Sequence, residues 1–232
     1  MYEIEEALNI MRVSVGGICR RVDEEHECSE AELGKWIKIE SAFYTPFFES
    51  RCSGTKDIAL LKLAESVSDD IHHICLPHLH DTDELYDSSA RLFSSGYGTD
   101  RKRCVLNVPI NFRSHVGVKM TDAECDENLD SRKPDTFCTF ERAERNVCHG
   151  DSGGGVTTSL EGRHYLVGLV SFGTSCTDLA MGSRTGAQVH TDLAYYTADI
   201  DEFLDMKVED RKKRWEKIEE QLGKSEIKGL VE

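Results

Sequence analysis

The run from Cys148 to Gly155 contains the residue types that acyl-transfer chemistry needs. It reads Cys-His-Gly-Asp-Ser-Gly-Gly-Gly, so Ser152 stands among four glycines. Glycine adopts backbone conformations that are closed to other residues, so this turn can expose the Ser152 hydroxyl and aim successive N–H groups at one point. A nucleophile beside converging N–H donors is the arrangement of a covalent hydrolase with an oxyanion hole. Taken alone, a Gly/Ser/Asp cluster is more often an ordinary loop.

Other segments of the chain could position a site around Ser152. Asp57 stands directly before the apolar run Ile58–Leu63, which we expect to be a strand buried on both faces. The apolar run Leu166–Phe172 predicts a second strand, which ends at Gly173. Shorter runs predict further strands at Met11–Val15, Trp36–Glu40, Val105–Ile110 and Val116–Met120. No amphipathic helices alternate with these strands, so the pattern favours an all-β sandwich or barrel.

The C-terminal end has a different pattern. Apolar residues at helical spacing run from Ile200 to Leu222, and Gly223 follows as a stop signal. They predict a charged, partly amphipathic helix that packs its apolar stripe on the preceding strands. Binding of a partner is the alternative role.

These segments, in this order, resemble the chymotrypsin-like serine endopeptidases of the trypsin fold. Cys75-Leu76-Pro77 resembles the interdomain linker of that family, and Ser95–Gly98 and Val189–Asp192 resemble two of its local motifs. The resemblance implies two Greek-key β-barrels, the first incomplete, plus a charged C-terminal α-helix. It divides the chain into a remnant of the first barrel with the linker (1–80), a second barrel with the nucleophile loop (81–198) and a helix with a tail (199–232).

The resemblance also implies catalytic roles. Ser152 matches the nucleophile of the family, and Asp57 matches the carboxylate that orients the imidazole. The amides of Gly150 and Ser152 match the oxyanion hole. Asp151 matches the residue that pairs with the new N-terminus after zymogen cleavage.

Substrate-binding roles follow in the same way. Asn146 matches the base of the primary specificity pocket, where it cannot supply the negative charge that a simple Lys/Arg preference requires. Gln188 also falls near this pocket, on a loose alignment. Ser171, Phe172 and Gly173 match the edge strand that hydrogen-bonds the substrate backbone.

The base of the family is a histidine upstream of the aspartate, and it has no match here. Only His26 precedes Asp57, and it follows the Met11–Val15 strand in an acidic loop, so we interpret it as a surface residue. The activation N-terminus of the family is not found either. We therefore expect a serine endopeptidase whose natural chain extends upstream and which is inactive as written. The alternative is a non-catalytic protease homologue that acts as a protein-binding module.

Cysteines and histidines are numerous. Cys125 and Cys138, and Cys148 and Cys176, stand where the family has two disulfides. We favour a bond between Cys19 and Cys28, and leave open the partners of Cys52, Cys75 and Cys104. One segment is rich in possible metal ligands: His72, His73, Cys75, His78 and His80. Their spacing matches no closed zinc ligand set, so we expect neither a metal nor a cofactor. A metal-binding module is a third alternative for the function.

Composition sets limits on partners and compartment. The chain has 232 residues, a formal net charge of −15 and nine cysteines. The acidic balance disfavours nucleic acid and anionic membranes, which select basic surfaces, and leaves a protein or peptide substrate as the partner. The cysteine content favours secretion into an oxidising compartment, although the acidic start of the chain does not form a signal peptide.

Overall fold

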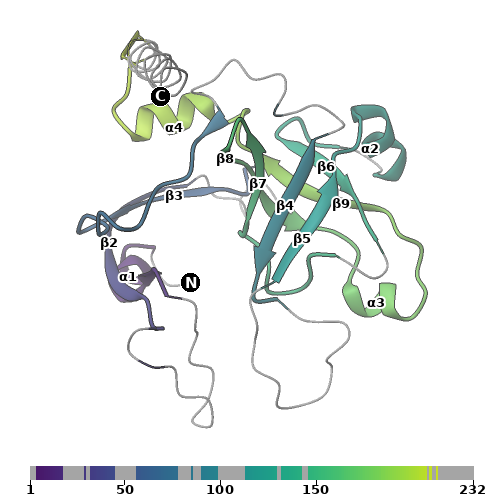
Figure 1. Cartoon of the computed structure of the whole chain (residues 1–232), viewed down its shortest axis with the longest axis horizontal. Coiled ribbons are helices and arrows are strands. Elements are labelled where there is room, and N and C mark those ends of the chain that lie inside the picture. The colour runs from purple at the N-terminus through teal and green to yellow at the C-terminus, as the bar shows by residue number, and fades with distance from the viewer. Residues whose placement is uncertain are drawn as a thin grey trace, which may run out of the picture.

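The computed structural model of the chain describes residues 4–17, 29, 32–44, 56–77, 85, 90–98, 113–129, 132–142, 146–207, 209–210 and 213. Within these residues most of the regular structure is antiparallel strand, arranged in a six-stranded and a three-stranded sheet (Figure 1). The expected all-β class is confirmed, with one nearly closed barrel and one smaller sheet. His26, the Val105–Ile110 segment and the Cys19–Cys28 pair lie outside the described residues.

The smaller sheet is open and thinly covered. It consists of β1 (Arg12–Val15), β2 (Lys35–Tyr44) and β3 (Ala59–Leu63), in the order β1-β2-β3. A short helix, α1 (Ile4–Ile10), precedes β1 and contacts β2. Among the described residues of this sheet only Ile37 is fully buried.

The expectation that the Ile58–Leu63 strand is buried on both faces is wrong. Strand β3 is an edge strand, and Leu61 is 39% exposed. An apolar run shows that a strand can be buried, but not whether another layer covers it.

The six-stranded sheet is the main body of the protein. Its strands are β4 (Arg91–Gly96), β5 (Arg113–Val118), β6 (Thr136–Phe140), β7 (Gly155–Leu160), β8 (Arg163–Phe172) and β9 (Ala187–Asp192). Their order is β5-β4-β7-β8-β9-β6, and a bridge between Lys119 and Thr139 joins the two ends, so the sheet nearly closes into a barrel. The interior of the barrel holds one hydrophobic cluster: Leu85, Leu92, Phe137, Val147, Val156, Tyr165, Val167 and Val170.

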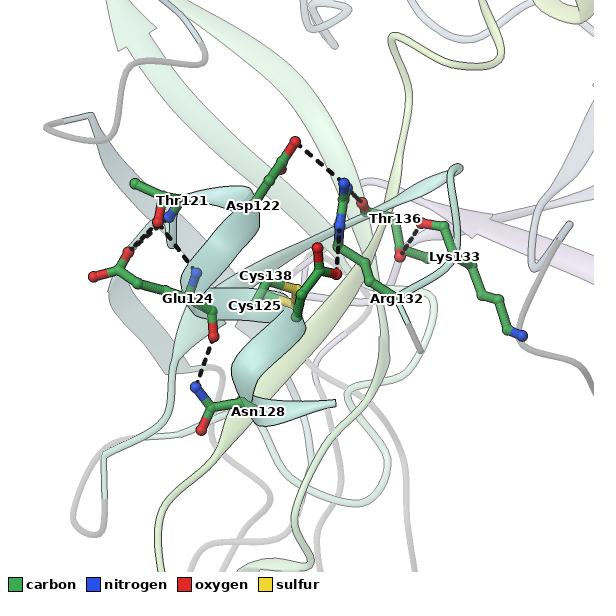
Figure 2. A network of polar contacts seen from close by, with 10 residues as sticks. Thr121, Asp122, Glu124, Cys125, Asn128, Arg132, Lys133, Thr136 and Cys138 are labelled. Atoms are coloured by element: carbon green, nitrogen blue, oxygen red, sulfur yellow. Dashed lines mark hydrogen bonds and ion pairs between the residues drawn. A yellow bond between two sulfur atoms is a disulfide. The ribbon is translucent and has the colours of Figure 1, made fainter. Parts of the chain in front are cut away.

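Helix α2 (Asp122–Asn128) is pinned to the barrel (Figure 2). A capping box at Thr121 satisfies N–H groups at the start of the helix. A disulfide joins Cys125 on the helix to Cys138 on β6, and Arg132 forms ion pairs with two aspartates of the helix. The side chains in Figure 2 therefore hold one corner of the barrel together.

The helix expected from Ile200 to Leu222 is interrupted. Helix α4 (Thr197–Phe203) ends in a turn in which Asp205 has a positive φ of 51°, and helical conformation resumes at Glu209, Asp210 and Lys213. Ile200 is buried and belongs to a cluster against which Ile58 and Leu60 pack. Helix α4 thus covers the junction between β3 and the barrel. None of the helices among the described residues is long and apolar enough to cross a membrane.

Candidate functional site

The structure brings Ser152 and Asp57 to the two sides of Ser171. Ser152 is exposed in the turn before β7, and its Oγ donates to the backbone oxygen of Ser171 at 3.5 Å. The Oγ of Ser171 in turn donates to Oδ2 of Asp57 at 2.6 Å. The hydroxyl of Thr191 on β9 donates to the backbone oxygen of Asp57 at 2.9 Å. Ser171 on β8 therefore holds the carboxylate of Asp57, and Thr191 on β9 holds its backbone, just before the start of β3.

Asp151 anchors the loop that carries Ser152 through two hydrogen bonds of its carboxylate. Its carboxylate is buried, with Oδ1 accepting from the N–H of Gly98 at 2.7 Å and Oδ2 accepting from the N–H of Cys148 at 2.8 Å. A Cβ atom on Gly96 or Gly98 would lie 2.1 or 2.4 Å from this carboxylate. Both positions must therefore be glycine for the end of β4 to approach the loop.

Two amides of the same loop are open to a ligand. Gly150 has a positive φ of 98°, a conformation that favours glycine. The N–H of Asp151 donates to Cys148 O and that of Gly153 donates to Val170 O. The N–H groups of Gly150 and Ser152 donate to no atom of the described residues. These two donors, beside an exposed hydroxyl, form an arrangement that can stabilise an oxyanion.

No imidazole completes the site within the described residues. Neither the Ser152 hydroxyl nor the Asp57 carboxylate is hydrogen-bonded to a histidine ring there. His149 lines the same pocket as Ser152 and is exposed. His190 lies inside the barrel, where its Nε2 is 2.9 Å from Thr139 Oγ1, and burial lowers its pKa from 6.5 to about 3. It is therefore neutral at physiological pH.

A pocket of about 630 Å³ opens beside Ser152. Ser171, Phe172 and Gly173, for which we expect a role in substrate binding, are among the residues that line it. Asn146 is not among the lining residues, and its buried Nδ2 has no hydrogen-bond partner in the described part of the chain. Gln188 does line the pocket.

The cysteines near the site are bonded as the resemblance implied. Cys148 and Cys176 form a disulfide that lies in the wall of the pocket, and Cys125 is bonded to Cys138. Cys75 is a free thiol and is half-buried. Among the described residues no group of three or more His, Cys, Asp or Glu side chains could hold a metal ion. His78 and His80 lie outside those residues.

Glu141 is a residue of the site that the sequence did not reveal. It is 6% exposed and lies just after β6, with Oε1 accepting from the N–H of Thr174 at 2.6 Å and Oε2 accepting from the N–H of Gly186 at 2.7 Å. It thus ties together two loops around the pocket. A single glutamate in a polar segment carries no local signal of such a role.

Comparison with known proteins agrees with this geometry. Residues 11–194 match the family model described as Trypsin. The "Trypsin-like protease try-5" of Caenorhabditis elegans is 33% identical over 207 residues, which cover 86% of this chain and 62% of the nematode protein. The "CLIP domain-containing serine protease B9" of Anopheles gambiae is 28% identical over 68% of this chain and 39% of its own length. The "Vitamin K-dependent protein C" of Macaca mulatta is 30% identical over 61% of this chain and 94% of that sequence.

The chain covers less than two thirds of the nematode and mosquito relatives, 62% and 39% of their lengths. The activities and partners of those whole proteins therefore depend on regions that these alignments do not include.

Proposed function

Because the chain belongs to the trypsin-like serine protease family, we propose that it serves as an endopeptidase that forms an acyl-enzyme on Ser152. One observation supports this most directly. The exposed Ser152 hydroxyl shares a pocket wall with the loop in which the amides of Gly150 and Ser152 are open to a ligand. The two amides flank Asp151 on one loop, so both lie close to the hydroxyl whose reaction they would serve.

The reaction would run along the edge of β8. A peptide would lie in extended form beside Ser171–Gly173 and exchange main-chain hydrogen bonds with that segment. The Oγ of Ser152 would bond to the carbonyl carbon, and the oxyanion would receive hydrogen bonds from the amides of Gly150 and Ser152. The C–N bond then breaks, the amine leaves with the proton taken from Ser152, and water releases the acid.

The proton transfer needs a base, and Asp57 is placed to orient one. In a triad the carboxylate holds an imidazole that takes the hydroxyl proton and then passes it to the leaving amine. Ser171 and Thr191 already fix Asp57, so an imidazole that joined the site would meet a positioned acceptor. Loss of one triad member costs on the order of 10⁶ in kcat, so activity depends on this group.

A second function, peptide binding without cleavage, is favoured by one observation. Within the described residues no histidine ring contacts Ser152 or Asp57 by a hydrogen bond. The pocket and the edge of β8 would serve a peptide ligand equally well without a base. In this case the partner is still a protein or peptide.

Labelling with a fluorophosphonate separates the two functions. For the natural protein, isolated from its native source, we expect covalent labelling at Ser152 and none in Ser152→Ala. Folded protein that is not labelled would favour the binding module.

We also propose that the protein acts outside the cell. The two disulfides among the described residues belong to a domain type that is typical of extracellular proteins, because disulfides persist in oxidising compartments. Retention of both bonds in protein taken from the extracellular medium, measured by non-reducing mass mapping, is the expected result. Detection of the protein only in the cytosol, with reduced thiols, would contradict it.

A further inference from the structure

A buried aspartate is hydrogen-bonded to the segment that carries Asp57. Asp135 stands directly before β6 and is 2% exposed. Its Oδ2 accepts from the N–H of Lys56 at 2.7 Å and from the hydroxyl of Tyr196. Burial, together with this hydrogen bond, raises the pKa of Tyr196, so the hydroxyl stays protonated and donates. One carboxylate oxygen therefore holds two groups that lie 79 and 61 positions away in the sequence.

The residue before Asp57 has an unusual backbone conformation. Lys56 has a positive φ of 64°, which residues other than glycine rarely adopt. Such a conformation persists only where the surrounding structure holds it. The hydrogen bond from Lys56 to Asp135 fixes the amide at one end of the bond about which φ rotates. The direction in which the chain enters Asp57 therefore depends on Asp135.

The other end of this short segment is held by a strand that neighbours Asp135. Thr136, the next residue after Asp135, pairs with Thr191 across β6 and β9. Thr191 in turn donates to the backbone oxygen of Asp57. The amide of Lys56 and the carbonyl of Asp57 are thus both held from one corner of the barrel. With both fixed, the carboxylate that leaves this backbone has one preferred direction.

The buried carboxylate of Asp135 is not explained by packing. Its Oδ1 has no hydrogen-bond partner within the described residues, and no lysine or arginine there forms an ion pair with the side chain. A buried charge without an ion pair costs free energy, and a neutral side chain of the same branched shape would avoid that cost. What the carboxylate provides is a fixed acceptor for the N–H of Lys56.

We propose that Asp135 is a positioning residue for the reaction at Ser152. It holds Lys56 in its left-handed conformation, and through Lys56 it sets the direction in which the Asp57 carboxylate meets the base. Asp135 is not among the residues that line the pocket, so its effect on the reaction passes through Asp57. The inference rests on the proposed function, because Asp57 orients a base only if the protein is a peptidase.

The rate at which a fluorophosphonate labels Ser152, measured against pH in the natural protein, tests this role. Asp135→Leu keeps the branched shape of the side chain and removes the acceptor. We expect the labelling rate constant to fall about tenfold, because a displaced carboxylate orients the base poorly. The midpoint of labelling should move to lower pH, because a displaced carboxylate stabilises the protonated base less. An unchanged rate would overturn the proposal, as would a fall that only follows the loss of folded protein and leaves the midpoint in place.

Two further variants separate positioning from support of the fold. Asp135→Asn keeps an oxygen that can accept from Lys56, so its labelling rate should stay within about twofold of the wild type. Tyr196→Phe removes the other hydrogen bond of the same oxygen and leaves the bond from Lys56 in place, which makes it the matched control. It should lower stability without moving the midpoint of labelling. Equal effects of Tyr196→Phe and Asp135→Leu on the midpoint, or an asparagine variant as slow as the leucine variant, would refute the assignment.

A thermodynamic cycle tests the same role without catalysis. In the wild type, Ser171→Ala and Asp57→Asn should be coupled by about fivefold in the equilibrium constant of unfolding, because the two side chains are hydrogen-bonded. In Asp135→Leu this coupling should disappear. Coupling that is absent from the wild type, or unchanged in the leucine variant, would contradict the proposal.

If the leucine variant does not fold, hydrogen exchange of the wild type gives the second reading. The amide of Lys56 should exchange about a hundredfold more slowly than an unbonded amide. Exchange as fast as that of an unbonded amide would show that Asp135 does not hold Lys56.

The two proposals fail in different ways. If the wild type is not labelled but the coupling disappears in Asp135→Leu, the catalytic function fails and the hold of Asp135 on Asp57 stands. If the wild type and Asp135→Leu are labelled at the same rate, the role of Asp135 fails and the catalytic function stands.

Discussion

The six-stranded barrel and the three-stranded sheet are built from similar strands but bury very different amounts of apolar surface. The barrel has a continuous interior cluster, and its two ends are bridged. In the described part of the smaller sheet Ile37 alone is fully buried, and Trp36 is 65% exposed. The Ser152 loop and the pocket belong to the barrel, whereas Asp57 stands just before β3 of the open sheet. The comparison shows that the barrel, through Ser171 and Thr191, sets the position of Asp57.

The largest expected effect is the loss of a barrel disulfide. Replacing both Cys148 and Cys176 by serine opens a bridge between residues 28 apart, and should lower the free energy of unfolding by about 3–4 kcal/mol. Urea unfolding under non-reducing conditions measures it. Cys75→Ser, at the free thiol, is the control and should cost less than about 1 kcal/mol. Equal losses would mean that the bridge does not constrain the barrel.

One substitution made in both regions tests the comparison directly. Leu92 is 2% exposed in the barrel, and Leu61 is 39% exposed on β3. Leu92→Ala should lower the free energy of unfolding by about 3 kcal/mol, because it leaves a cavity. Leu61→Ala should lower it by less than about 1 kcal/mol, because water already reaches the side chain. Similar losses at the two sites, measured by urea unfolding, would show that the sheet is covered in solution.

The barrel interior should also make stability depend on pH. Burial lowers the pKa of His190 to about 3, so below pH 6.5 the unfolded state binds a proton that the folded state rejects. Stability is therefore lost as the pH falls from 6.5 towards 3, by about 2 kcal/mol between pH 7 and pH 5. The difference in this pH dependence between the wild type and His190→Phe, from urea unfolding, isolates the contribution. No difference between the two proteins would show that water reaches the ring.

The smallest expected effect concerns the link between the regions. Ser171→Ala removes the hydrogen bond to Asp57, and should lower the free energy of unfolding by about 1–2 kcal/mol. A double-mutant cycle with Asp57→Asn should give a coupling of about 1 kcal/mol. Additive effects would mean that Asp57 is held by the smaller sheet rather than by the barrel.

The fold of the barrel could largely be predicted from the sequence. The apolar run Leu166–Phe172 forms the C-terminal part of β8. It is apolar because Val167 and Val170 belong to one hydrophobic cluster, while Leu166 and Leu169 pack against a second cluster that includes Ile200. The edge position of β3 could not be predicted, because apolar periodicity does not report what covers a strand. The break at Asp205 was missed because helical spacing continues past it on both sides.

The site residues that lie in local motifs could be predicted from the sequence, but the positions of Gln188 and Glu141 could not. The structure brings Ser152, Ser171 and Asp57 together, and each of them lies in or next to a recognisable local motif. Gln188 follows a segment without a motif after Cys176, so the resemblance placed it only loosely, and the folded structure is needed to put it in the lining of the pocket. Glu141 acts on two loops that are distant in sequence, and only the folded backbone shows this.

The contacts of Asp57 also decide when the site can assemble during synthesis. Asp57 accepts its hydrogen bonds from residues 114 and 134 positions further along the chain. At a translation rate of roughly 5–20 residues per second, Asp57 leaves the peptidyl-transferase centre about 6–20 s before Ser171 is made. The smaller sheet is therefore synthesised well before the barrel strands that hold Asp57. The nascent chain cannot form this site until Ser171 and Thr191 have been made.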